Sequence, residues 1–203
     1  MNQRRERRER VDKRISKQKP GAPSGVEIFR LNGDGLAQHL DPIAEILHAC
    51  VHDGVNVGFV LPFDLNQARS FWVQKILPCL VANTRIVLAA KVDDQVAGTV
   101  QLNLDTPPNQ PHRAEVSKLL VHPKYRMLGI GRSLMEQIES NGVNAGRRLL
   151  TLDTATDFAE KLYISLGYER AGHIPGYARE PNEDRLVGTT IMYKVLEATN
   201  GAE

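Results

Sequence analysis

The sequence predicts a single domain of the α/β (α+β) class, in which helices cover both faces of a mixed β-sheet. Apolar residues alternate between a period of two and a period of about 3.6, in the order β-α-α-β-β-β-α-β-α-β-β. No internal repeat is visible, and a length of 203 residues argues against two full domains. We place the domain at residues 26–203 and expect residues 1–25 to form a disordered basic tail and linker.

The net charge of +2 belongs to the tail. Residues 1–19 contain nine Lys or Arg and three acidic residues, a charge of +6, which leaves −4 for residues 20–203. The tail is either a solvated segment or one that binds RNA, a membrane surface or an import receptor. Residues 20–203 lack the basic patch of a nucleic-acid-binding domain, so we expect no nucleic-acid partner for the domain.

The composition favours a cytoplasmic protein without a membrane span or a structural metal. No apolar run approaches the roughly 20 residues of a membrane helix, and the charged N-terminus does not resemble a signal peptide. Cys50 and Cys79 both fall inside predicted helices, as reduced thiols do in cytosolic proteins. No cluster of Cys and His has the spacing of metal ligands.

A strand and one helix open the domain. Val26–Leu31 reads as the strand, and apolar residues at helical spacing predict a continuous amphipathic helix over Leu36–Val51. A long loop, His52–Phe63, follows and is rich in glycine and apolar residues. Apolar loops of this length usually cover a core edge or a ligand.

A second helix and a hairpin come next. Asp64 and Gln67 form a capping box for the helix, and Pro78 should end it. Ile86–Val92 and Val96–Leu104 are strand-like runs joined by two aspartates, which predicts a tight β-hairpin.

The next strand leads into a glycine turn. Ala114–Val121 reads as a strand that Pro123 stops, and Gly129 and Gly131 then open an amphipathic helix, Ile130–Asn144. A helix that starts at such a turn is a candidate anion site, because its free N–H groups and its dipole converge there.

Three kinds of phosphate loop could explain these glycines. A P-loop requires Lys-Ser or Lys-Thr after them, which is absent, and a dinucleotide fingerprint requires a third glycine where Leu134 stands. The pyrophosphate turn of coenzyme A acyltransferases, R/Q-x-x-G-x-G/A, matches Arg126-Met127-Leu128-Gly129-Ile130-Gly131. The hexapeptide alone is equally compatible with a glycine-opened helix that packs closely on its strand.

The C-terminal part adds three strands and one helix. The strands are predicted over Leu149–Asp153, Tyr168–His173 and Val187–Leu196, and the helix over Phe158–Leu166. Asp157 and Glu160 should cap the start of this helix, and Gly167 its end.

From about Val26 to Leu196 the chain resembles the GNAT family of acetyl-CoA-dependent N-acetyltransferases. The shared motifs are Leu119-Leu120-Val121-His122-Pro123, the Arg-x-x-Gly-x-Gly turn, and Ala159-Glu160-Lys161-Leu162-Tyr163-Ile164-Ser165-Leu166-Gly167-Tyr168. The resemblance implies a mostly antiparallel sheet of six to seven strands, about four helices on its two faces, and a splayed central parallel pair ending near Val121 and Asp153.

Within that family the chain is similar to the tabtoxin-resistance type of acetyltransferase. This similarity rests on His112-Arg113-Ala114-Glu115-Val116, Leu152-Asp153-Thr154, Ile174-Pro175-Gly176-Tyr177-Ala178 and Gly58-Phe59-Val60-Leu61-Pro62.

The resemblance implies acetyl-CoA as the cofactor, with its pantetheine in the splayed cleft and its pyrophosphate on the glycine turn. The residues implied in binding it are Leu119, Leu120, Val121, Arg126, Met127, Leu128, Gly129, Ile130, Gly131, Arg132, Ser133, Thr156 and Ala159. Thr156 stands where many members of the family have an Asn that contacts pantetheine, and its hydroxyl can still form a hydrogen bond.

Three side chains are the catalytic candidates. Direct acetyl transfer needs a neutral amine, so a base must accept a proton from the ammonium group. Glu115 and Asp153 match the pair of acids expected to serve as base in the tabtoxin-resistance branch. Tyr163 matches the family tyrosine that points at the sulfur of coenzyme A. The alternatives are an edge-strand ion pair for Glu115, a turn residue for Asp153 and a core tyrosine for Tyr163.

The expected acceptor is a small amine or amino acid, with a toxin or antibiotic among the candidates. We expect Phe59 in the apolar loop and Tyr177 and Arg179 in the last hairpin to line its pocket, Arg179 holding a carboxylate. Acetylation of a protein N-terminus or lysine and a non-catalytic acyl-CoA sensor remain open alternatives. We expect a monomer or a homodimer.

Overall fold

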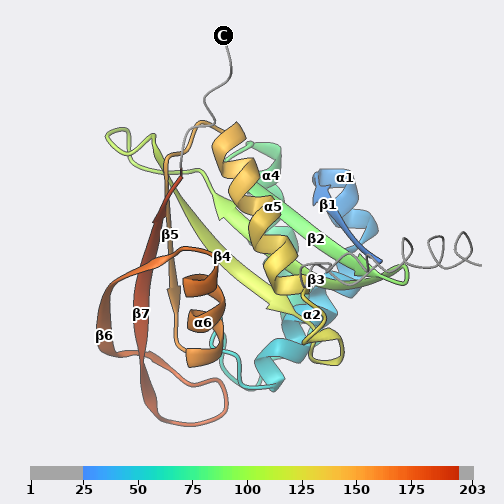
Figure 1. Ribbon diagram of the computed structural model, residues 1–203. Coiled ribbons are helices and arrows are strands. Elements are labelled where there is room, and N and C mark those ends of the chain that lie inside the picture. Colours follow the sequence, from blue (N-terminus) through green and yellow to red (C-terminus); the bar gives the residue numbers. More distant parts are fainter. Residues whose placement is uncertain (1–24, 197–203) are drawn as a thin grey trace, which may run out of the picture.

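A seven-stranded sheet forms the centre of the computed structural model, which describes residues 25–196 (Figure 1). The strand order is β1-β2-β3-β4-β5-β7-β6, and every neighbouring pair is antiparallel except β4 and β5. The strands are β1 (Val26–Leu31), β2 (Arg85–Val92), β3 (Gln95–Asn103), β4 (Arg113–Val121), β5 (Leu149–Thr154), β6 (Glu169–Arg179) and β7 (Leu186–Val195). The predicted fold class is confirmed, whereas the predicted tail and linker, apart from Gly25, lie outside the described residues.

Helices cover both faces of this sheet. They are α1 (Gly33–Gln38), α2 (Leu40–His52), α3 (Leu65–Phe71), a π-helical segment (Trp72–Ile76), α4 (Leu77–Val81), α5 (Ile130–Asn144) and α6 (Asp157–Ser165), with a short 3₁₀ turn at Pro123–Tyr125. Figure 1 shows α5 crossing the strands on the near side. No helix within residues 25–196 has the length and hydrophobicity needed to span a membrane.

The alternation of side chains in the strands creates one apolar core on each face. In β2, Val87 and Ala89 pack into the core beneath α1–α4, whereas Ile86, Leu88 and Ala90 pack into the core beneath α5 and α6. Successive residues of a strand point to opposite faces, so a run that is apolar throughout marks a strand covered on both sides.

The predicted continuous helix over Leu36–Val51 is wrong. The segment contains two helices, α1 and α2, that meet at His39. Pro42 explains the break, because it lacks an N–H and is tolerated in a first helical turn but not in a helix interior. The Asn32 side chain accepts a hydrogen bond from the Gly35 N–H at 2.7 Å and so caps α1.

Pro78 does not end the second helix. The helix begins with the predicted capping box and continues through the π-helical segment and α4 to Val81. The Leu77 N–H bonds to the Trp72 carbonyl across the wider turn. Pro78 then lies at the start of a new α-helical segment, where its missing N–H costs little.

The last helix starts with a different cap from the predicted one. Thr156, not Asp157, is its N-cap, and the Thr156 hydroxyl accepts a hydrogen bond from the Ala159 N–H at 3.2 Å. Glu160 instead forms an ion pair with Arg170. Gly167 ends the helix with a φ of 87°, as the sequence predicts. The two-aspartate hairpin between β2 and β3 is also confirmed.

We expect Gly98→Ala to lower the free energy of unfolding by about 1–3 kcal/mol. A Cβ at this β3 position would lie 2.9 Å from the Leu120 carbonyl and 3.1 Å from side-chain atoms of Ile130 and Leu134. Urea denaturation measures the loss. Gly172→Ala is the matched control, because its Cβ would have no neighbour within 4 Å; its change should stay within roughly 0.5 kcal/mol. Equal stability of the two variants would contradict the tight packing of α5 on β3.

Candidate active site

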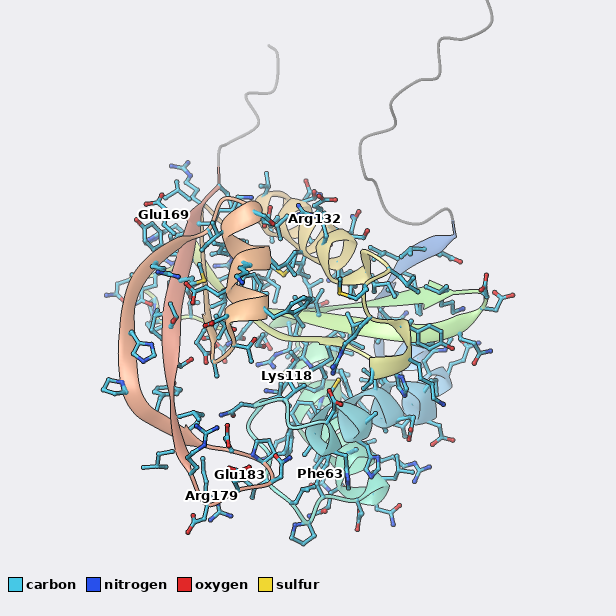
Figure 2. The ribbon with its side chains drawn as sticks, turned by 60° about the horizontal axis from the view of Figure 1, so that its bottom comes forward. Phe63, Lys118, Arg132, Glu169, Arg179 and Glu183 are labelled. Atoms are coloured by element: carbon cyan, nitrogen blue, oxygen red, sulfur yellow. The ribbon has the colours of Figure 1, made fainter. Side chains whose placement is uncertain are left out.

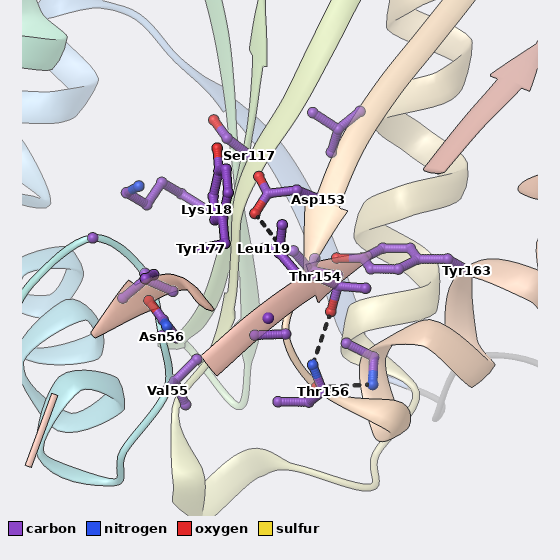
Figure 3. Close-up of a pocket in the computed structure, with 18 residues that line it drawn as sticks. Val55, Asn56, Ser117, Lys118, Leu119, Asp153, Thr154, Thr156, Tyr163 and Tyr177 are labelled. Carbon is purple, nitrogen blue, oxygen red and sulfur yellow. Dashed lines mark hydrogen bonds between the residues drawn. The ribbon is translucent and has the colours of Figure 1, made fainter. Parts of the chain in front are cut away.

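The parallel strands β4 and β5 separate partway along their length. Their pairing ends at Glu115 and Thr151, although β4 continues to Val121 and β5 to Thr154. A cavity of about 310 Å³ lies between the diverging ends, and it is closed by residues 55–58 and by the β6–β7 hairpin (Figure 3). Ligands of α/β folds commonly bind beyond the carboxyl ends of such strands.

A β-bulge in β4 directs two residues toward this cavity. Gln101 pairs with Ser117 and Thr99 pairs with Leu120, so one residue of β3 faces Lys118 and Leu119 of β4. Lys118 takes a φ of 50°, and its carbonyl accepts a hydrogen bond from the Thr99 hydroxyl at 3.4 Å. Bulges of this kind re-aim side chains beside functional sites.

Asp153 and Tyr163 both reach into the cavity (Figure 3). The Asp153 carboxylate, exposed at the end of β5, accepts a hydrogen bond from the Thr189 hydroxyl at 3.0 Å. Tyr163 is 6% exposed, and its hydroxyl bonds to no other residue between 25 and 196. Burial and, secondarily, the charge of Asp153 raise the pKa of Tyr163, so the phenol stays protonated in neutral solution.

Glu115, the second predicted acid, does not join them. It is exposed on β4 in the part of the strand that still pairs with both neighbours, and it does not line the cavity. The structure therefore offers one carboxylate, Asp153, among the residues that line the site.

Three of the predicted cofactor residues line the cavity: Leu119, Thr156 and Ala159. Leu120 points its side chain into the core and is 1% exposed, so only its main chain could meet a ligand. Val121 packs against the core on the other face. The Thr156 hydroxyl is already engaged in capping α6, as an Asn at this position could also be.

The glycine turn forms a cradle of amides at the start of α5. Within the described chain, the N–H groups of residues 127–132 donate to no acceptor. Met127 and Gly129 take φ values of 64° and 77°, which fold the turn so that the amides precede a 15-residue helix. Free amides together with the helix dipole fit a pyrophosphate group.

The charged side chains of this turn make contacts within the protein. Arg126 forms an ion pair with Asp53 at 2.5 Å, and so joins the turn to the start of the 53–63 loop. Arg132 donates to the Ser165 hydroxyl at 2.6 Å. Ile130 is buried in the core, whereas Met127 is 82% exposed. The backbone of the turn is therefore its free binding element, since both arginines have partners.

The predicted acceptor residue Phe59 does not line the cavity. Its ring packs against Phe63 and Phe71, with centroids 4.6 Å and 5.4 Å away. Residues 55–58 of the same loop form the wall instead. The Leu61 N–H bonds to the Pro181 carbonyl at 2.8 Å, which holds the loop against the β6–β7 hairpin.

Strand β6 is longer than predicted and carries Tyr177 to the cavity. It continues past His173 to Arg179 through a wide bulge between Ile174 and Ala178. Gly188 of β7 allows this close approach, because a Cβ there would lie 2.3 Å from the His173 ring. Tyr177 lines the cavity as expected.

Arg179 lies outside the cavity. It pairs with Asp184 at 3.6 Å, and its side chain is half exposed. Figure 2 shows it at the end of the β6–β7 hairpin, near Glu183 and away from Lys118.

Lys118 is the cavity residue that sequence reasoning missed. It is the only cation among the residues that line the cavity, and its Nζ lies 5.8 Å from the centroid of the Phe71 ring. Burial, followed by the charge of Arg85, lowers the pKa of Lys118. The sequence offers little signal for it, because Glu115 and Ser117 are further polar residues of the same strand.

Among residues 25–196, no group of three or more His, Cys, Asp or Glu side chains could hold a metal ion. Cys50 is buried and donates to the Val121 carbonyl at 3.5 Å, and burial raises the pKa of its thiol to about 11. It does not line the cavity, so it offers no nucleophile to the site.

Comparisons with known proteins agree with this architecture. A sequence model of the acetyltransferase (GNAT) family matches residues 62–168. A GCN5-related N-acetyltransferase from Kribbella flavida aligns with a TM-score of 0.70 at 22% identity, covering 86% of this chain and 100% of that one. A ribosomal-protein-alanine N-acetyltransferase from Brucella melitensis aligns with a TM-score of 0.66 at 22% identity, covering 84% and 99%. A putative acetyltransferase, yncA, from Salmonella typhimurium, solved with its cofactor acetyl-CoA, aligns with a TM-score of 0.67 at 16% identity, covering 89% and 99%.

Proposed function

The chain belongs to the acetyltransferase (GNAT) family, whose model matches more than half of its length, and we propose that it acetylates the amine of a small molecule. Family membership makes the chain an acyltransferase, and acetyl-CoA is the acetyl donor of the family. The observation that carries the proposal is the meeting of one carboxylate and one protonated phenol, Asp153 and Tyr163, in a single small cavity.

The described residues suit acetyl-CoA at three points. The free amides of residues 127–132 would hold its pyrophosphate. The gap between β4 and β5 would take the pantetheine arm, with Thr156 and Ala159 along one wall. The main chain at Leu119, unpaired with β5, would meet the acetyl end. Bound there, acetyl-CoA would supply an activated acetyl group for attack by an amine.

Asp153 and Tyr163 would divide the proton transfers. Asp153 would accept a proton from the ammonium group of the acceptor, which frees the nitrogen lone pair for attack on the thioester carbon. As the carbon–sulfur bond breaks and the amide bond forms, Tyr163 would give its proton to the departing sulfur. The amide nitrogen would lose its second proton to solvent. The proton held by Asp153 would return to the phenol, directly or through solvent, which leaves the enzyme unchanged and releases one proton per turnover.

Two features favour a small acceptor over a protein. The cavity volume of about 310 Å³ is at the small end of ligand sites. Residues 55–58 and Tyr177 narrow the acceptor side, whereas a peptide would need an open groove. The similarity to the Brucella enzyme, whose name specifies a protein substrate, keeps protein acetylation as the second candidate. A toxin-like amino acid, as in the tabtoxin-resistance branch, and a cytoplasmic location are part of the same proposal.

Calorimetric titration with acetyl-CoA, followed by assays of thiol release with a panel of amines, tests the function. We expect saturable binding of acetyl-CoA and release of thiol with at least one small amine but not with peptides. Turnover of peptides alone would support the protein acetyltransferase. Tight binding without turnover of any acceptor would support the acyl-CoA sensor.

We expect Ser133→Glu to weaken acetyl-CoA binding by at least roughly tenfold without loss of stability. A carboxylate in the first turn of α5 interacts favourably with the helix dipole but competes with the pyrophosphate for the same amides. Gln137→Glu, which adds the same charge one turn later on an exposed position, is the control and should bind normally. Equal affinities in the two variants would place the pyrophosphate elsewhere.

A further inference from the structure

We propose that Lys118 binds a carboxylate of the acceptor, so that the acceptor is a small amino acid and not a simple amine. This assignment rests on the proposed function and adds the chemical class of the substrate. It also moves the carboxylate site from Arg179, where the sequence suggested it and which lies outside the cavity, to a residue that lines the cavity.

The charges in the cavity form a complementary pair of sites. Lys118 and Asp153 are the only charged residues that line it, and they belong to the two strands that splay apart, β4 and β5. Figure 3 shows Lys118 directed toward the wall formed by residues 55–58, whereas Asp153 stands on the β5 side near Tyr163. An acceptor with an ammonium at Asp153 and a carboxylate at Lys118 would neutralise both.

Lys118 has no anionic partner in the part of the chain that the structure describes. No Asp or Glu oxygen within residues 25–196 lies within 4.0 Å of its Nζ, which lies 5.8 Å from the centroid of the Phe71 ring. The carboxylates of Asp153 and Glu115 act on it only from farther away. The next cation, Arg85, donates to Gln101 at 2.8 Å and adds positive potential. A half-buried ammonium with no carboxylate in contact is stabilised by any carboxylate that enters the cavity.

The backbone at this position does not explain the choice of lysine. A φ of 50° favours Gly, Asn or Asp, and a long side chain gains nothing there from the turn itself. The presence of lysine at this bulge therefore indicates that its side chain has a function. Asn56 also lines the cavity, and its buried amide nitrogen donates to no residue between 25 and 196. It could donate a second hydrogen bond to the same carboxylate.

Competing amino acids with their carboxamides tests the assignment, because the two differ only in the charged group. We expect wild-type kcat/KM to favour the carboxylate by about 10- to 100-fold. Lys118→Met should erase this preference by raising KM for the amino acid about 10- to 100-fold, with KM for the carboxamide and both kcat values nearly unchanged. Lys118→Arg should keep the preference, since its charge remains.

Lys91→Met is the matched control. Its Nζ also lies over an aromatic ring, 4.9 Å from the Phe29 centroid, but on β2 and away from the cavity. It should leave the preference intact. A wild type that does not distinguish amino acids from carboxamides, or a Lys118→Met variant that loses kcat with both, would overturn the assignment while leaving the proposed function standing. Absence of turnover with every amine and carboxamide would instead overturn the proposed function.

Discussion

Replacing Asp153 by asparagine is expected to lower kcat/KM by about 10²- to 10⁴-fold at neutral pH. The carboxylate is the one acid that lines the cavity, and an amide of the same shape cannot accept a proton from the acceptor ammonium. The loss should shrink as the pH of the assay rises toward the pKa of the amine, because solvent then supplies the neutral amine without a base.

The substitution leaves the structure around position 153 in place. The asparagine side-chain oxygen can still accept the hydrogen bond that the Thr189 hydroxyl donates to Asp153 at 3.0 Å. The side chain is exposed to the cavity, so no buried charge is lost and the thermal midpoint should not change appreciably. Circular dichroism melts and acetyl-CoA affinity confirm that the variant is intact.

Glu115→Gln separates the two acids that the sequence put forward together. Glu115 lies outside the cavity, so its amide variant should keep nearly the full kcat/KM. A loss at position 115 as large as that at position 153 would show that both acids act, through water or after a movement of β4. Full activity of Asp153→Asn would rule out Asp153 as the base.

The sequence predicts the elements of the proposed donor side well, because their signals are local. The glycine turn, the helix that it opens and the strand before it lie within residues 114–144, and their periodicity and turn residues need no distant contact. The splayed strand pair follows from the resemblance to the family. The capping of α6 by Thr156 is also a local feature. The sequence nevertheless predicts the wrong cap, because Asp157 and Glu160 also fit the pattern of capping residues.

The acceptor side depends on pairings between distant strands. The bulge at Lys118 exists only in the register of β4 on β3, and strand periodicity alone assigns that residue to a regular strand. Tyr177 reaches the cavity because Gly188 of the partner strand allows a second bulge. The Phe59 ring packs on Phe63 and Phe71. The sequence cannot distinguish a phenylalanine that packs in this way from one that lines a pocket.

Replacing Tyr163 by phenylalanine is expected to lower kcat by about 10²-fold while acetyl-CoA binding and stability stay close to wild type. The Tyr163 hydroxyl bonds to no other described residue, so its removal leaves no protein group unsatisfied. What is lost is the proton donor to the departing sulfur, and the ring that packs against Tyr168 at 5.7 Å between centroids remains.

Tyr168→Phe provides the matched control on the neighbouring ring. Tyr168 is also buried, and burial followed by Glu139 raises its pKa, but it does not line the cavity, so its variant should keep kcat. Equal kcat values for the two variants would remove the assignment of Tyr163 as the acid.

The pH profile tests whether the phenol of Tyr163 stays protonated in the working enzyme. A general acid works in its protonated form, which is present below its pKa and lost as the pH rises through it. Because the pKa of Tyr163 is raised above its ordinary value, the wild type should show no alkaline fall in kcat from this group in the usual range of assays. Tyr163→Phe should therefore run parallel to the wild type at lower kcat. A wild-type profile that falls near the ordinary tyrosine pKa, and a variant without that fall, would contradict the raised pKa of Tyr163 in the complex, while the protonated phenol would remain the acid.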